Sequence, residues 1–369
     1  MTGIPAFAWV WAALLVAVPW QGGKRGGERA PLPQLNGANV PVRLAYFYKP
    51  PEDGTTSSFL ARHVQLVILT QGDEAYRDEL RRNGFPGMVL QSVAANETEG
   101  PGPYATADAS CDLRFRAYQR TMADRDDTFC RQIHPHESWF LHNLRGERLY
   151  NTHRSGNGVL RVIYRMNPGD RGWRRFAAQK LLSYHRLDYD GIFLDDLALS
   201  RSGVLNEPEN RGGLMEYGDD AAFRSAVIGY LTVVRKVLHG VPLWANLTSD
   251  PGSPGSWKTY LPFLEGVMVE DFVWGWRSYG LTASQREIQL ENVRGALAKG
   301  RRVLVVAQGG RTQRARLVVA LACYHVLDNG RLYFRYADAG DADYRNFWWY
   351  PQYSGALEMR NLPACRVPG

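Results

Sequence analysis

Two short apolar runs in this chain each end in two acidic residues, and in each run the first acid comes four residues after a glycine. The runs are residues 191–196 (Gly-Ile-Phe-Leu-Asp-Asp) and residues 266–271 (Gly-Val-Met-Val-Glu-Asp). Alternate side chains of a strand point to opposite faces, so each first acid shares its face with the apolar residue two positions earlier. A carboxylate in such apolar surroundings is costly unless it is paired or used in a reaction.

Two carboxylates of this kind are the groups needed to hydrolyse a glycosidic bond, in which one is the acid and the other is the nucleophile or base. We therefore predict Asp195 as nucleophile or base and Glu270 as proton donor. Asp196 and Asp271 are expected to have lesser roles at the edge of the substrate site. The competing interpretation is that these acids only cap helices or pair with arginines. The reaction requires no cofactor, and none is expected.

Polar and aromatic residues at the ends of other apolar runs are expected to surround the same site and bind sugar hydroxyl groups. Each one alone is more often a hydrogen-bonding residue of the core or of a loop, so the prediction depends on their convergence. The candidates are Tyr46, Tyr48, Gln91, Asn246, Trp274 and Gln308.

Eight apolar runs alternate with helical stretches along the chain. Strands that alternate with helices predict a parallel sheet in an α/β fold, and nearly continuous apolar runs predict a sheet covered on both faces. Their number and the chain length fit a single (β/α)8 TIM barrel, in which catalytic groups lie at the carboxyl ends of the strands. The runs are residues 42–48, 64–69, 87–93, 189–195, 241–245, 266–270, 302–307 and 331–336.

A long connection, residues 94–168, follows the third run and is rich in Gly, Pro and acids. We interpret it as an insertion with its own small hairpin. Because it leaves the carboxyl end of the third strand, it is expected to lie over the mouth of the barrel. Connections of this length within a compact domain are usually functional or disordered.

Three histidines, His134, His136 and His142, lie close together around Glu137 and suggest a metal site. Pro135 is incompatible with a regular helix there, and the HExxH spacing of zinc hydrolases is absent, so no metal ligand is assigned. The chain also has no GxSxG, P-loop or GxGxxG motif, which leaves serine hydrolase, NTPase and dinucleotide-binding functions without support.

Composition is that of a globular protein, with 45% hydrophobic and 22% charged residues among 369, and with 12% aromatic residues. The net charge is +7, and 38 of the 44 basic residues are arginines because the chain has only six lysines. These arginines are scattered through the sequence, whereas nucleic-acid binding favours a concentrated basic patch. No nucleic-acid partner is expected.

The N-terminal segment predicts export. Residues 5–18 are apolar, too few to span a bilayer comfortably but suited to a signal sequence, although no Lys or Arg precedes them. We predict a signal-peptide-like segment at residues 1–20, a linker at 21–37 and the barrel domain at 38–369, in a secreted or cell-envelope protein. An uncleaved anchor is the alternative, and no other segment is apolar enough to enter a membrane stably.

Four cysteines occur without CxxC spacing, which argues against a zinc or thioredoxin-type site. In an exported protein Cys111 and Cys130 would form a bridge, whereas unpaired, partly buried thiols are the alternative. Whether Cys323 and Cys365 pair is left open.

Residues 189–196 (Tyr-Asp-Gly-Ile-Phe-Leu-Asp-Asp) resemble a strand signature of TIM-barrel glycoside hydrolases. These include bacterial hypothetical glycosyl hydrolases and, more distantly, enzymes similar to endo-α-1,4-polygalactosaminidase. The resemblance extends over residues 42–337, with further matching segments at residues 45–48, 139–142, 166–168 and 269–271. It implies a barrel that hydrolyses a polysaccharide or oligosaccharide, with the catalytic pair at Asp195 and Glu270.

Two other functions fit the same residues. One is a carbohydrate-binding barrel that keeps the cleft without a competent catalytic pair. The other is a metal-dependent polysaccharide deacetylase or hydrolase that uses the region from His134 to His142.

Overall fold

The computed structural model describes residues 41–115, 122–123, 128–154, 160–205, 213–247, 256–275, 281–337, 344–354 and 365. Residues from Gly37 to Gly369 belong to one compact unit. The predicted signal-like segment, residues 1–20, and the predicted linker, residues 21–37, lie outside the described residues. In the described part of the chain, no helix combines the length and apolar character needed to cross a bilayer.

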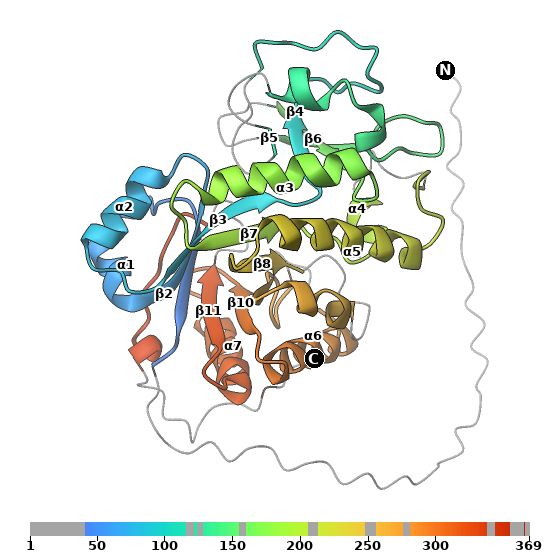
Figure 1. The fold of residues 1–369 in the computed structure, drawn as a ribbon. Helices are drawn as coiled ribbons and strands as arrows, with labels where there is room; N and C mark the ends of the chain where they lie inside the picture. Colours follow the sequence, from blue (N-terminus) through green and yellow to red (C-terminus); the bar gives the residue numbers. More distant parts are fainter. Residues whose placement is uncertain are drawn as a thin grey trace, which may run out of the picture. The chain divides into compact units, whose positions relative to one another are not determined.

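Eight parallel strands form a closed barrel, as Figure 1 shows. Their order around the barrel is β1-β11-β10-β9-β8-β7-β3-β2. Each strand falls within or overlaps one of the eight predicted runs, so the predicted TIM barrel is confirmed. The strands are β1 (Leu44–Tyr48), β2 (Val64–Thr70), β3 (Met88–Ala94), β7 (Gly191–Asp195), β8 (Leu243–Asn246), β9 (Gly266–Val269), β10 (Arg302–Gln308) and β11 (Leu332–Ala337).

Helices surround the barrel, and α3 and α5 lie side by side along its outside (Figure 1). Side chains of Thr56, Asp170, Asp219 and Thr282 accept a backbone hydrogen bond at the helix starts that they precede, which satisfies amides that otherwise lack a partner. The helices are α1 (Ser57–His63), α2 (Glu74–Arg82), α3 (Arg171–His185), α4 (Ser202–Leu205), α5 (Asp220–Val237), α6 (Ala283–Ala298) and α7 (Arg314–Leu327). Short 3-10 helices are η2 (Glu137–Trp139), η4 (Ser256–Thr259), η5 (Leu261–Phe263) and η6 (Pro351–Ser354), and η1 (Phe129–Ile133) is a π-helix.

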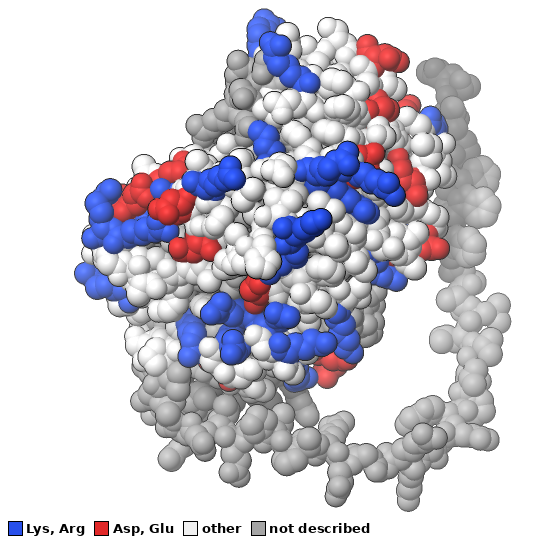
Figure 2. Space-filling model, viewed as in Figure 1, with Lys and Arg blue, Asp and Glu red and all other residues white. Residues whose placement is uncertain are grey.

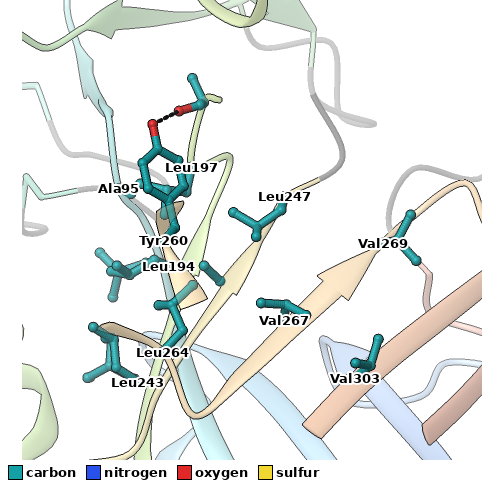
Figure 3. Packing of buried hydrophobic residues seen from close by; sticks show 14 of the residues in the cluster. Ala95, Leu194, Leu197, Leu243, Leu247, Tyr260, Leu264, Val267, Val269 and Val303 are labelled. Carbon is teal, nitrogen blue, oxygen red and sulfur yellow. Dashed lines mark hydrogen bonds between the residues drawn. The ribbon is translucent and has the colours of Figure 1, made fainter. Parts of the chain in front are cut away.

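The strands bury both of their faces, in two separate groups of side chains. One group fills the barrel and includes Phe193, Trp244 and Met268. The other packs between the barrel and its covering segments. Figure 3 shows Leu194 and Leu243 of this group near Tyr260 and Leu264, and Val267 and Val303 farther along on the neighbouring strands β9 and β10. The Tyr260 hydroxyl donates a hydrogen bond to the Ala198 carbonyl, which fixes the segment after β7.

The insertion after β3 contains the predicted hairpin as part of a three-stranded antiparallel sheet. Its strands are β4 (Glu97–Gly100), β5 (Tyr150–Arg154) and β6 (Leu160–Arg165), in the order β4-β6-β5, and β5 and β6 pair as a hairpin. Disulfides join Cys111 to Cys130 within the insertion and Cys323 to Cys365. The first pairing was predicted for an exported chain, and the second had been left open.

Glycines at the start of β7 and β9 leave room for larger neighbours. Gly266 lies opposite Trp244 in the strand register, and a Cβ at this position would lie 2.2 Å from the Trp244 ring. A Cβ on Gly191 would lie 2.5 Å from the Pro242 carbonyl oxygen. Separations this short require the neighbours to move, so both positions are restricted to glycine by packing.

We expect Gly266→Ala to destabilise the barrel by about 2 kcal/mol, because the added methyl group overpacks a closed core. Gly295→Ala is the matched control, since a Cβ there meets nothing within 4 Å and alanine favours the helix over glycine by roughly 0.5–1 kcal/mol. Denaturant unfolding measures both free energies. Equal stabilities of Gly266→Ala and the wild type would contradict the packing argument.

Candidate active site

The predicted catalytic acids lie at the carboxyl ends of two strands that are separated by one other strand. Asp195 ends β7, Glu270 follows β9, and Asn246 ends β8 between them. All three share the strand face of residues that fill the barrel, because they follow Phe193, Trp244 and Met268 by two positions. The sequence therefore directs three polar side chains into one end of the barrel.

One amide nitrogen bonds both carboxylates. Asn246 Nδ2 donates to Asp195 Oδ1 at 3.2 Å and to Glu270 Oε2 at 2.8 Å. These two oxygens therefore lie no farther apart than the two distances combined, about 6 Å. Both acids are buried, with 6% of Asp195 and 8% of Glu270 exposed. The two carboxylates thus share one site.

Asp195 is held through one of its two oxygens. Oδ1 accepts hydrogen bonds from the Tyr48 hydroxyl at 3.1 Å, from Asn246 Nδ2 and from the backbone amide of Asp196 at 3.2 Å. Within the described residues, Oδ2 accepts no hydrogen bond. The carboxylate is therefore oriented by Oδ1, and Oδ2 is the oxygen left to face a substrate.

Gln308 and Tyr344 form a hydrogen-bonded pair beside the backbone of Glu270. Gln308 Nε2 donates to the Glu270 carbonyl oxygen at 2.6 Å and to the Tyr344 hydroxyl at 2.9 Å. Its Oε1 is buried and has no hydrogen-bond partner among the described residues. The Tyr344 ring lies 4.9 Å from the Phe47 ring and 6.1 Å from the Tyr48 ring, between centroids. Sequence reasoning missed Tyr344, because it follows the last strand in a stretch without regular structure.

The second acid of each run, Asp196 or Asp271, takes no part in the hydrogen bonds that Asn246 donates to Asp195 and Glu270. Asp196 is exposed, has a positive φ of 50° and donates its backbone amide to Asp195. Asp271 is buried toward α6, where its Oδ1 accepts a hydrogen bond from Gln289 Nε2 at 2.9 Å. Burial raises the pKa of Asp271 to about 7. Asp271 therefore fixes its loop to a helix, while Asp196 lies at the mouth.

Two of the predicted substrate contacts are not at the mouth, and the prediction for Tyr46 and Gln91 is corrected. Tyr46 belongs to the group between the barrel and its helices, and the Arg335 guanidinium lies 4.9 Å from the centre of its ring. Gln91 alternates with Leu90, which faces the barrel interior, so it faces the helices and is fully buried. In a strand that is apolar on both faces, the sequence does not show which face is inside.

Trp274 lies in the loop after β9 and is half-buried. Its Nε1 donates to the Arg316 carbonyl at 3.1 Å, and the Arg316 guanidinium lies 5.1 Å from the ring centre. The loop is thus tied to the first turns of α7, and one face of the indole is covered by a cation.

The histidines of the insertion form a hydrogen-bond network. His142 bonds Glu216 Oε1 through Nδ1 at 2.6 Å and Glu137 Oε1 through Nε2 at 2.8 Å. The buried Arg148 binds both oxygens of Glu137 and donates to His134 Nδ1 at 2.9 Å. His134 must then carry its proton on Nε2, which lies 2.9 Å from the Ala109 carbonyl.

This network uses both ring nitrogens of His134 and His142, so neither has a nitrogen left for a metal ion. In the described ranges, no three His, Cys, Asp or Glu side chains come together in a group that could ligate a metal. The bond from His142 to Glu216 instead joins the insertion to the segment before α5. A second bond, from the Met215 amide to the His142 carbonyl at 2.9 Å, strengthens the same junction.

No protein-family model matches this chain, and no curated protein matches it at a significant level. It is similar to the solved glycoside hydrolase domain of PelA from Pseudomonas aeruginosa, with 16% sequence identity and a TM-score of 0.44 over 77% of this chain and 90% of that one.

Two further solved structures show a likeness of the same size. Aspergillus fumigatus Ega3 in complex with galactosamine has 8% identity and a TM-score of 0.45, over 87% of this chain and 98% of that one. The α-amylase from H. orenii has 10% identity and a TM-score of 0.46, over 84% and 73%. Similarity at this level does not assign an activity, so the activity is argued from the residues of the site.

The network at His142 makes the stability of the protein depend on pH. Burial lowers the pKa of His142, but hydrogen bonds from its ring to Glu216 and Glu137 outweigh burial and raise it above the ordinary value. A raised pKa contributes stability that is complete below about pH 6.5, the unfolded value, and is lost as pH rises through the folded value. His142→Gln should therefore destabilise the protein more at about pH 6 than at about pH 9.

Denaturant unfolding of the wild type and His142→Gln at both pH values measures this difference. His239→Gln, a substitution of an exposed histidine, is the matched control. If His142→Gln destabilises the protein equally at both pH values, the imidazole contributes to stability through packing and not through its protonation.

Proposed function

We propose that this protein is a glycoside hydrolase that cleaves the O-glycosidic bonds of a polysaccharide, with Asp195 as nucleophile and Glu270 as proton donor. One observation carries the proposal: two buried carboxylates at the carboxyl end of the barrel bond the same amide nitrogen of Asn246. This brings two acids within reach of one bond, which is the arrangement that glycoside hydrolysis needs.

A purely structural role accounts poorly for Asp195. The next described helix, α4, begins at Ser202, too far along the chain for Asp195 to cap it. No Lys or Arg in the described ranges forms an ion pair with Asp195. Its burial is therefore compensated by neutral donors alone. Such an arrangement leaves a negatively charged oxygen facing the mouth, where a reaction can use it.

The hydrogen bonds assign a role to each oxygen. Because Glu270 Oε2 accepts from Asn246, the proton that Glu270 transfers belongs on Oε1. Oδ2 of Asp195 would attack the anomeric carbon while Glu270 protonates the departing oxygen. Water then attacks the glycosyl-enzyme bond, and Glu270 takes the proton of that water. An upper limit of about 6 Å between the two bonded oxygens is compatible with the separation of retaining pairs, about 5–5.5 Å, and retention is the outcome that this direct attack by Asp195 requires.

Other groups at the mouth suit a sugar. The buried Oε1 of Gln308 is an acceptor without a partner in the part of the chain that the structure describes, and a sugar hydroxyl supplies a donor. The Trp274 ring and the exposed Asp196 carboxylate stand on loops that follow β9 and β7. We further propose that the protein is exported, on the basis of the apolar residues 5–18 and the disulfides.

Replacing either acid by its amide tests the pair. We expect Asp195→Asn and Glu270→Gln each to lower kcat/KM about 1,000-fold, since each removes one of the two groups that the chemistry needs. Incubation with a panel of polysaccharides, followed by mass spectrometry of the released sugars, identifies the substrate and provides the assay. A glycoside with a good leaving group should restore the first step in Glu270→Gln, seen as a burst of released leaving group, because that group needs no proton. The second step should stay slow, because it lacks the base that accepts the proton of water.

Asp188→Asn and Glu287→Gln, both at exposed positions, are the matched controls and should retain wild-type activity. Wild-type turnover by Asp195→Asn would refute its role. Binding of a glycan without release of any product would instead favour a carbohydrate-binding barrel.

Asn246 tests the shared amide. Asn246→Asp keeps the shape of the side chain but removes both donated bonds and adds a third negative charge beside the pair. A like charge favours protonation of neighbouring carboxylates, so the acid limb of the kcat/KM profile should move to higher pH, with activity lowered roughly 100-fold at neutral pH. An unchanged pH profile would show that Asn246 does not link the two acids.

A further inference from the structure

At the end of the barrel where the strands begin, basic side chains outnumber acidic ones. In the connections that lead into the strands, the acids Asp188, Asp190, Glu265 and Asp328 all pair with arginines of the same end. Nine other cations there form no ion pair in the described part of the chain. This group, here called the basic rim, consists of Arg62, Arg82, Arg186, Lys236, Arg294, Lys299, Arg301, Arg302 and Arg331.

The basic rim lies at the end opposite the candidate active site. Parallel strands all begin at one end of a barrel, and the acids Asp195 and Glu270 stand where β7 and β9 finish. In Figure 2, Lys and Arg gather where Figure 1 draws α6 and α7, with few acids among them. The rim therefore presents a broad positive surface and leaves the mouth uncovered.

The N-terminal part of the chain joins the barrel at this same end. The Val42 amide donates to the Tyr353 carbonyl at 3.1 Å, the Arg43 carbonyl accepts from Phe334 at 2.8 Å, and β1 begins at Leu44. Residues 5–18 are apolar and are followed by Lys24, Arg25 and Arg29. β1 therefore starts at the end of the barrel that carries the basic rim.

Two exposed apolar side chains lie at this end as well. Leu187, between α3 and β7, is 41% exposed, and Trp349 is 37% exposed. The Trp349 ring lies 4.6 Å from the ring of His63, in the last turn of α1. Cations interspersed with an exposed tryptophan and leucine suit the headgroup region of a bilayer, where tryptophan is enriched.

We propose that the basic rim docks on an anionic lipid bilayer, so that the mouth of the barrel faces away from the membrane. One apolar attachment binds a membrane only marginally, and a basic patch is the second signal that makes the attachment stable. Each Lys or Arg held within a Debye length of the anionic surface adds to the affinity, and salt weakens it.

Vesicle co-sedimentation of the full chain tests this orientation. Phosphatidylcholine vesicles measure the apolar attachment, and vesicles that also contain phosphatidylglycerol add the electrostatic part. We expect the triple variant Arg294→Gln, Lys299→Gln, Arg331→Gln to lose its preference for anionic vesicles by about tenfold or more. Binding to the neutral vesicles should stay unchanged, and added salt should reduce the wild-type preference in the same way.

The matched control removes three exposed cations away from the rim, as Arg145→Gln, Arg171→Gln, Arg175→Gln, and should retain the wild-type preference. Circular dichroism and thermal melts establish that both variants fold. Equal loss by the two variants would show that net charge alone acts, and no loss by the rim variant would also overturn the proposal. If the rim variant loses binding to a soluble acidic polysaccharide but binds vesicles normally, the partner of the rim is an acidic polymer and the bilayer proposal is overturned.

Discussion

The amide of Asn246 is the constraint on which the site depends. Adjacent strands lie about 4.8 Å apart, so the ends of β7 and β9, with β8 between them, are separated by roughly 10 Å of sheet. Two carboxylates buried at that distance need donors, and a residue on β8 is placed to reach both. A short side chain with two N–H bonds on one atom meets this requirement, since Nδ2 donates one hydrogen to each acid. The residue type on the middle strand thus fixes how closely the outer two acids approach.

The packing below the site explains the spacing of four residues between glycine and acid. Side chains at positions i, i+2 and i+4 of a strand share a face, so Gly266, Met268 and Glu270 all belong to the interior face. Trp244 fills the interior two positions before Asn246, and its ring lies where a Cβ of Gly266 would be. A glycine at the start of the strand and an acid at its end are therefore two consequences of one layered interior. The small residue admits the indole, and the polar residue meets the open end.

The sequence was sufficient to predict where the strands lie along the chain, but not which of their side chains point into the barrel. Buried parallel strands are apolar on both faces, which makes the runs easy to find and hides which side chains point inward. For this reason Asp195, Asn246 and Glu270 could be grouped from their places at strand ends, whereas Tyr46 and Gln91 were grouped wrongly. No pattern in the sequence identified Tyr344 as a residue of the site, because its position depends on how the chain folds back after β11. The bond of Asn246 to both acids also depends on strand order, which alternation alone does not give.

Parallel topology also separates the chemistry of the two ends. The carboxyl ends hold the buried acids Asp195 and Glu270, and the connections that enter the strands hold the basic rim. From Arg302 to Gln308 the six steps of β10 span about 20 Å, about two and a half times the Debye length of roughly 8 Å at physiological ionic strength. Charges of the basic rim are therefore largely screened from the carboxylates at the mouth. Because of this separation, the positive charge of the basic rim is available for the proposed binding to a bilayer. The orientation of Asp195 and Glu270 depends instead on local hydrogen bonds from Tyr48, Asn246 and Gln308.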